Sequence, residues 1–236
     1  DLSVVREAKI LYLDYNATTP IRDEVKQSMI EVMGPPLNSS SVHSYGRKAK
    51  SYLQNARNSV ANLINSNNDQ IVFTSGGTEA NSMIMQSSKR PLISSIEHDA
   101  VMASSSNSEF IEVNSDGVVN LDKLEAKINT SKPDMISVMW ANNETGVIQP
   151  INEIVEIAKK FKIHVHCDAV QAVGKIKIDF KSSGLNSMAI SSHKIGGPVG
   201  VGALVLSDPF KINPIIFGGG QERGHRSGTE NLIGIL

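Results

Sequence analysis

Short apolar runs alternate with helix-like segments between residues 71 and 206, and this alternation restricts the fold more than any other feature. Each run has the length of a buried strand. The runs are 71–73, 92–94, 110–113, 135–139, 163–167, 188–190 and 201–206. Strands that alternate with helices indicate an α/β domain with a mainly parallel sheet sandwiched by helices. We expect the last run, which follows glycine-rich sequence, to be an edge strand.

The intervening segments carry apolar residues at helical spacing or begin at helix-start signals. They are 76–85, a segment from about 99, 121–128 and 151–161. Two further helices are expected upstream, over 22–33 and 45–65. Pro20 lies just before the first of these, and Gly34-Pro35-Pro36 ends it.

Composition excludes several classes of protein. The 236 residues are 40% hydrophobic, which suffices for a large core. The formal charge of -1 and the 5% of aromatic residues argue against a nucleic-acid partner. No apolar run is long enough to span a bilayer, the N-terminus has no secretory signal pattern, and the single cysteine, Cys167, allows no internal disulfide. We expect a soluble cytoplasmic protein without a membrane partner.

Polar residues follow five of the expected strands, at Gly76-Gly77-Thr78, His98, Asn143, Asp168 and Lys194. Ligands of α/β sheets bind at the carboxyl ends of the strands. We therefore expect these groups to converge on one rim.

Lys194 follows the strand-like run 186–190, among hydroxyls and an imidazole in Ser191-Ser192-His193. Partial desolvation would lower the pKa of its amine, which could then form a Schiff base with an aldehyde cofactor. Taken alone, it could equally be a surface lysine in a strand-to-turn connection.

The glycine turn Thr74–Glu79 offers free backbone amides at a helix start, where an anion binds favourably. An ordinary capped turn explains it equally well. Its spacing matches neither the Walker loop nor the dinucleotide fingerprint, which disfavours ATP and NAD.

His98 could stack on a flat ring or move a proton, or lie beside a helix cap at Asp99. The amides of Asn142 and Asn143 and the carboxylate of Glu144 could hydrogen-bond a ligand or form a turn toward Gly146.

Asp168 could pair with a protonated pyridine nitrogen, with Gln171 supporting the ring, or could cap a short helix. His164 and His166 share one face of their strand and Cys167 faces the other, which leaves too few ligands for a structural zinc site. We expect no metal.

Near the chain end, Gly218–Thr229 is dense in glycine and contains two arginines. Such a loop suits anion contact or a subunit interface, or is simply flexible and solvated.

Together these residues resemble the class V aminotransferases, which use pyridoxal phosphate on a type I fold, and most closely the cysteine desulfurases that supply sulfur for iron–sulfur clusters. The resemblance is collinear over nearly the whole chain. Its motifs are Leu11–Pro20, Asn38–Gly46, Phe73–Asn81 and Arg226-Ser227-Gly228-Thr229. It implies that residues 1–236 form the cofactor-binding large domain, with 1–33 packing on it, and that the C-terminal small domain is absent.

The resemblance also assigns roles. Lys194 would hold pyridoxal phosphate and move the α-proton of L-cysteine, His98 would stack on the ring and assist that transfer, and Asp168 would stabilise the pyridinium nitrogen. The remaining cofactor contacts would come from Gly77, Thr78, Asn143, Gln171, Ser191 and His193. Thr229 would reach the phosphate of a neighbouring subunit in a homodimer. An iron–sulfur scaffold or other acceptor protein would take the sulfur.

The family's sulfur-accepting cysteine and its carboxylate-binding arginine lie well beyond the Arg226–Thr229 motif, whereas this chain ends at Leu236. Cys167 abuts Asp168 in a strand and cannot replace that cysteine. Relatives often carry tyrosine where this chain has Gly196. We therefore expect the chain to bind the cofactor but to turn over L-cysteine poorly or not at all. Another class V enzyme (an aminotransferase or a selenocysteine lyase) and a non-catalytic fragment are the alternatives.

Overall fold

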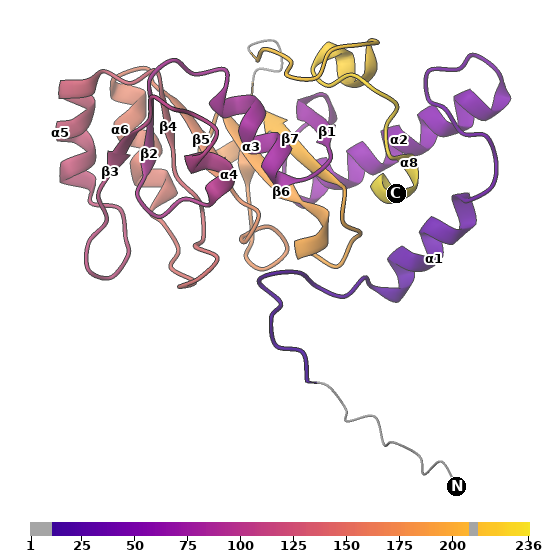
Figure 1. The fold of residues 1–236 in the computed structure, drawn as a ribbon, viewed down its shortest axis with the longest axis horizontal. Coiled ribbons are helices and arrows are strands. Elements are labelled where there is room, and N and C mark those ends of the chain that lie inside the picture. Colours follow the sequence, from indigo (N-terminus) through magenta and orange to yellow (C-terminus); the bar gives the residue numbers. More distant parts are fainter. Residues whose placement is uncertain (1–10, 208–211) are drawn as a thin grey trace, which may run out of the picture.

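A seven-stranded mixed sheet forms the centre of the molecule in the computed structural model, which describes residues 11–207 and 212–236 (Figure 1). Its strand order is β1-β7-β6-β5-β4-β2-β3. The strands are β1 (Ile71–Thr74), β2 (Pro91–Ser94), β3 (Glu109–Ile111), β4 (Met135–Ser137), β5 (His164–Asp168), β6 (Ser187–Ser191) and β7 (Gly202–Leu206). The mainly parallel α/β sheet expected from the alternation is confirmed.

β7 is the one antiparallel strand of the described sheet, and it lies between β1 and β6. The expectation of an edge strand at 201–206 is therefore wrong. All five residues of β7 are buried, because neighbours cover both of its edges and helices lie over the sheet. A side chain at Gly202 would place its Cβ 2.5 Å from the backbone of Gly76, so this glycine allows β7 to lie against the turn after β1.

Helices cover both faces of the sheet. α2 (Ser44–Leu63), α5 (Leu121–Ser131) and α6 (Ile151–Lys160) pack on one face, in the core that contains Ile71 and Phe73 of β1. α3 (Gly77–Met85) and α4 (Asp99–Met102) pack on the other face with Val72. This division follows from the alternation of strand side chains between the two faces.

Short elements differ most from the sequence expectations. The helix expected from residue 99 is a single turn, α4, and α7 (Phe180–Ser183) was not expected. α1 (Asp23–Val32) and α8 (Leu232–Ile235) complete the described α-helices. None of the described helices is both long enough and apolar enough to cross a membrane.

The N-terminal segment runs along the rim of the sheet before α1 begins. Thr19 donates its backbone N–H to the carbonyl of His193 at 2.9 Å, and Arg22 donates to that of Gly196 at 2.9 Å. Residues 1–10 of the segment expected to pack on the domain lie outside the described residues.

Candidate active site

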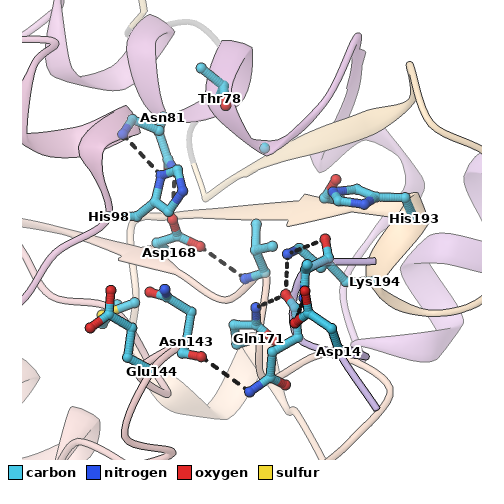
Figure 2. Close-up of a pocket in the computed structure, with 17 residues that line it drawn as sticks. Asp14, Thr78, Asn81, His98, Asn143, Glu144, Asp168, Gln171, His193 and Lys194 are labelled. Carbon is cyan, nitrogen blue, oxygen red and sulfur yellow. Dashed lines mark hydrogen bonds between the residues drawn. The ribbon is translucent and has the colours of Figure 1, made fainter. Parts of the chain in front are cut away.

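A pocket of about 550 Å³ opens at the carboxyl ends of the parallel strands (Figure 2). Its walls come from the turns after β1, β2, β4, β5 and β6 and from the N-terminal segment. Nine of the ten expected site residues line it: Gly77, Thr78, His98, Asn143, Asp168, Gln171, Ser191, His193 and Lys194. The expected convergence on one rim is therefore present in the fold.

The glycine turn presents the start of α3 to this pocket. The N-cap residue is Gly76, which has no side chain to satisfy the first helical amides. A Cβ on Gly77 would lie 2.6 Å from Cγ2 of Val170, so glycine is needed for the helix start to approach the turn after β5 this closely. Because α3 begins with unpaired amides beside the Thr78 hydroxyl, this end of the pocket suits an anion such as a phosphate.

Asp168 contributes a buried carboxylate to the pocket wall. It is 5% exposed, and each carboxylate oxygen accepts a hydrogen bond: from the backbone N–H of Val170 at 2.9 Å and from Nδ2 of Asn81 at 2.7 Å. Burial raises the pKa of Asp168, which these two bonds partly oppose. A buried carboxylate is best stabilised by a cationic partner, and a protonated ring nitrogen in the pocket would be one.

Lys194 ends the 3₁₀ turn Ser192–Lys194 that follows β6. Its Nζ donates to the backbone carbonyls of Asn16 and Ala17, the latter at 2.8 Å. Burial, reinforced by the charge of Lys175, lowers the pKa of Lys194, against the opposing charges of Asp14 and Asp168. The ammonium is thus less favoured than in water, as a nucleophilic amine requires.

His98 is the N-cap of α4, because its Nδ1 accepts the backbone N–H of Ala100 at 3.0 Å. The histidine itself, and not Asp99, caps this helix. With Nδ1 used as an acceptor, the neutral ring carries its proton on Nε2.

Asn142 and Asn143, which follow β4, make different contacts. Oδ1 of Asn142 accepts the backbone N–H groups of Glu144 and Thr145, at 2.9 and 2.8 Å, and so closes the turn. Asn143 lines the pocket. Asn142 therefore forms the turn, and a hydrogen bond from Asn143 to a ligand stays a prediction.

Gln171 and His193 fasten the N-terminal segment to the pocket. Nε2 of Gln171 donates to the carbonyl of Asn16 at 2.8 Å, and Nδ1 of His193 lies 3.2 Å from Oγ1 of Thr18. Burial and the neighbouring charge of Lys194 lower the pKa of His193. A neutral imidazole there can donate one hydrogen bond to a phosphate.

Glu144, a possible ligand contact from the sequence, also lines the pocket. The sequence pointed to no individual role for the other lining residues, which include Asp14, Asn16, Ala17, Asn81 and Met139. Asn81 could have been found, since it lies one helical turn after Gly77 and Thr78 and so shares their face. The path of residues 14–17 has no such local signal.

Thr229 does not line this pocket. It is exposed and lies beside a smaller cavity with Glu222 and Arg226. Its expected contact with a neighbouring subunit stays a prediction.

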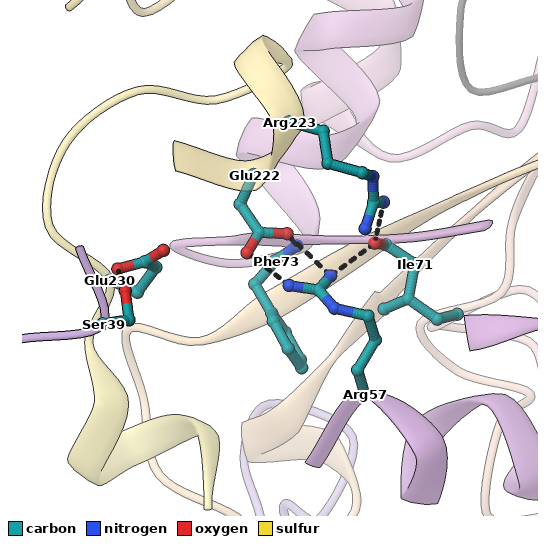
Figure 3. A network of polar contacts seen from close by, with 7 residues as sticks. All are labelled: Ser39, Arg57, Ile71, Phe73, Glu222, Arg223 and Glu230. Carbon is teal, nitrogen blue, oxygen red and sulfur yellow. Dashed lines mark hydrogen bonds and ion pairs between the residues drawn. The ribbon is translucent and has the colours of Figure 1, made fainter. Parts of the chain in front are cut away.

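The glycine-rich loop near the chain end is anchored by a buried ion pair (Figure 3). Arg57 of α2 makes two bonds to Glu222, of 2.6 and 2.8 Å, and the backbone N–H of Phe73 donates to the same carboxylate at 2.7 Å. Arg223 donates to the carbonyl of Ile71 at 2.6 Å. Arg226 pairs with Glu79 at the start of α3, at 2.9 Å. Both loop arginines therefore serve the fold rather than the described pocket.

Cys167 is fully buried on β5, and burial raises the pKa of its thiol well above the usual range. We expect the folded protein to leave this thiol unmodified by an aromatic disulfide reagent, because the reactive thiolate is suppressed and covered. The same reagent should titrate one thiol once the protein is unfolded in guanidinium chloride. Stoichiometric reaction of the native protein would contradict this assignment of Cys167.

Among residues 11–207 and 212–236, no three His, Cys, Asp or Glu side chains are grouped so as to hold a metal ion.

The chain is similar to known proteins along most of its length. Residues 11–235 match the model of the aminotransferase class-V family. The cysteine desulfurase IscS of Dictyoglomus turgidum is 40% identical, over 96% of this chain and 61% of that protein. That of Archaeoglobus fulgidus, cysteine desulfurase IscS 1, is 41% identical, over 95% and 63%. The chain therefore spans about three fifths of the length of these relatives.

Solved structures give the same result. A NifS-like protein from Rickettsia africae superposes with a TM-score of 0.92 at 42% identity, over 96% of this chain and 66% of the other. A structure described as SspA in complex with cysteine gives 0.89 at 30% identity, over 96% and 70%.

Proposed function

Because the chain belongs to the class-V aminotransferase family, whose members depend on pyridoxal phosphate, we propose that it is the cofactor-binding part of a cysteine desulfurase. The observation that carries the proposal is the single pocket in which Lys194, Asp168 and the start of α3 converge. An amine, a carboxylate and an anion-binding helix start match the aldehyde, the ring nitrogen and the phosphate of this cofactor.

The overall reaction proposed for the whole protein is L-cysteine plus a protein thiol giving L-alanine plus a protein persulfide. Bound pyridoxal phosphate supplies an electron sink for the bonds at the α-carbon of the amino acid. The sulfur atom passes from the β-carbon of L-cysteine to the thiol.

Different residues of the chain have different roles in the proposed reaction. Nζ of Lys194 holds the cofactor through its aldehyde carbon, and later takes and returns the α-proton. Asp168 keeps the ring nitrogen protonated by accepting its N–H. Seven further expected residues line the pocket. Gly77, Thr78, Ser191 and His193 would hold the phosphate, and His98, Asn143 and Gln171 would contact the ring or the substrate.

The thiol that accepts sulfur is not Cys167. That side chain is buried, and its raised pKa leaves it protonated. Cys167 is also the one cysteine of the sequence, so we propose that the acceptor thiol comes from outside residues 1–236. The final recipient of sulfur is proposed to be an iron–sulfur scaffold or another acceptor protein, and the working form a homodimer in which Thr229 reaches the partner's phosphate.

An assay with L-cysteine tests the proposed activity. The 236-residue chain with pyridoxal phosphate and a free thiol such as dithiothreitol, which takes the sulfur atom, should form L-alanine and no 2-oxo acid. Its rate should be at least ~10²-fold below that of the Rickettsia NifS-like protein, because an acceptor thiol that is not held beside the pocket loses the advantage of proximity. Release of 2-oxo acid would instead favour an aminotransferase, and alanine formation at the rate of the full-length relative would contradict the external thiol.

A further inference from the structure

A line of hydrogen-bonded side chains, buried up to the half-buried His164, leads from Asp168 through the fold to the other end of β5. Nδ2 of Asn81 lies 2.7 Å from Oδ2 of Asp168, and Oδ1 of Asn81 lies 2.9 Å from Nε2 of His166. Nδ1 of His166 lies 2.8 Å from Oγ of Ser187, which lies 3.0 Å from Nε2 of His164. Figure 2 shows the Asn81 end of this line, above Asp168.

Most of the side chains in this line are shielded from water. Asn81 is 1% exposed, and His166 and Ser187 are fully buried. Water has little access to these atoms, so their hydrogen bonds depend on the partners within the line. The three residues come from α3, β5 and β6, and the line therefore also joins one helical layer to the sheet.

The direction of every hydrogen bond follows from the charge of Asp168. An ionised carboxylate only accepts, so Asn81 must turn its NH₂ group toward Asp168 and its carbonyl oxygen toward His166. His166 must then carry its proton on Nε2, and its bare Nδ1 must accept from the Ser187 hydroxyl. The Ser187 oxygen in turn accepts from Nε2 of His164. All donors point toward the carboxylate, and such aligned bonds reinforce one another.

The titratable groups around Asp168 agree with an ionised carboxylate. Burial lowers the pKa of His166 to about 3, with a further contribution from His164, so His166 is neutral and carries one N–H. Burial raises the pKa of Asp168, but its bonds to Val170 and Asn81 and the charges of His98 and Lys194 oppose this rise and favour the ionised form. The nearby buried Glu97 has a pKa raised to about 8, first by burial and also by Asp168, and one of its oxygens has no partner among the described residues. Of the two buried carboxyls, Glu97 therefore holds the proton.

We propose that Asn81, His166 and Ser187 are positioning residues that hold Asp168 as an oriented carboxylate for the ring nitrogen of a bound nitrogen heterocycle. This inference rests on the proposed function for the identity of that heterocycle, pyridoxal phosphate. The line itself is a property of the chain without any ligand.

The wild-type protein without cofactor gives the first test. In ¹⁵N NMR of labelled histidine, His166 should be neutral with its proton on Nε2, and should remain so from pH 8 to about pH 4 because its pKa is about 3. A His166 with its proton on Nδ1, or an imidazolium at pH 7, would overturn the proposal without any variant having to fold.

Asn81→Leu then removes the bond to Asp168 at nearly constant volume. The pKa of Asp168, followed by ¹³C NMR of its carboxyl and assigned with Asp168→Asn, should rise by about one to two units, since a bond to a charged group is lost. The affinity for pyridoxal phosphate should fall about tenfold or more for the same reason. His166→Gln, which keeps a donor for Asn81, should retain a near wild-type pKa of Asp168, whereas His166→Leu should not.

Gln149→Met is the matched control. Gln149 is also a buried amide, at 3% exposure, and it bonds the backbone of Val119 and Gly117 at 2.8 Å, away from the pocket. Its replacement should lower stability but leave the pKa of Asp168 and cofactor affinity unchanged. If Gln149→Met and Asn81→Leu changed the pKa of Asp168 and the cofactor affinity equally, Asn81 would have only a structural role, which would overturn the proposal. If the wild-type chain bound no pyridoxal phosphate, the proposed function would fail, while the NMR measurements would still decide whether the line acts on Asp168.

Discussion

Lys194→Ala should slow exchange of the α-hydrogen of L-alanine with deuterated solvent by about 10²- to 10⁴-fold, the usual contribution of a positioned general base. L-Alanine is the useful probe because its exchange needs the lysine and the cofactor but no acceptor thiol. Proton NMR of the α-hydrogen, with pyridoxal phosphate in excess, gives the rate. The variant should also lose the visible absorption of bound cofactor.

Lys175→Ala is the control for this prediction. Lys175 bonds Oδ1 of Asn16 at 3.2 Å and also donates to Gln171, and burial lowers the pKa of Lys175 too. It does not line the pocket. Its loss should change the exchange rate less than about tenfold, because it removes one neighbouring charge and no reacting group. Similar losses in both variants would show that general charge near the pocket, and not the amine of Lys194, drives exchange.

Arg57→Met is expected to be the most destabilising substitution away from the pocket, by about 3–5 kcal/mol, because it leaves the buried carboxylate of Glu222 without its charged partner. The Arg57 and Glu222 side chains are 6% and 1% exposed. The substitution also removes a guanidinium lying 4.8 Å from the centre of the Phe73 ring. Guanidinium chloride unfolding, followed by far-UV circular dichroism, measures the loss.

The double variant Arg57→Met/Glu222→Leu shows whether the lost stability comes from the broken ion pair or from other contacts of Arg57. It should recover much of the lost stability, since apolar replacement of a whole buried ion pair is often neutral. Lys159→Met, which breaks the exposed pair with Glu156, should cost less than about 1 kcal/mol. Arg57 also donates to the backbone carbonyl of Ile71 at 2.5 Å. A double variant no more stable than Arg57→Met would mean that the arginine acts through this bond or through its contact with Phe73 instead.

The parts of the site that follow strand ends could be predicted from the sequence. Asp168 directly follows the apolar run 163–167, and Lys194 comes a few residues after the run 188–190. The parallel sheet then brings both residues to one rim. The start of α3 was equally visible, because the glycines mark a close strand-to-helix turn.

Contacts between buried side chains that are far apart in the sequence could not be predicted in this way. Glu222 is 165 residues from Arg57, and Asn81 is 85 residues from His166, so no local spacing connects them. β7 was misplaced for a related reason. The apolar run 201–206 indicates a buried strand, but the position of that strand in the sheet depends on which neighbours pair with its edges.

Reductive trapping with borohydride, followed by peptide mass mapping, shows directly whether Lys194 holds the cofactor. Reduction fixes pyridoxal phosphate to the lysine that holds it. We expect one cofactor per chain, attached to the peptide that contains Lys194 and absent after Lys194→Ala. Stoichiometric attachment to Lys175 or another lysine, or no attachment to the folded wild-type protein, would contradict this role of Lys194.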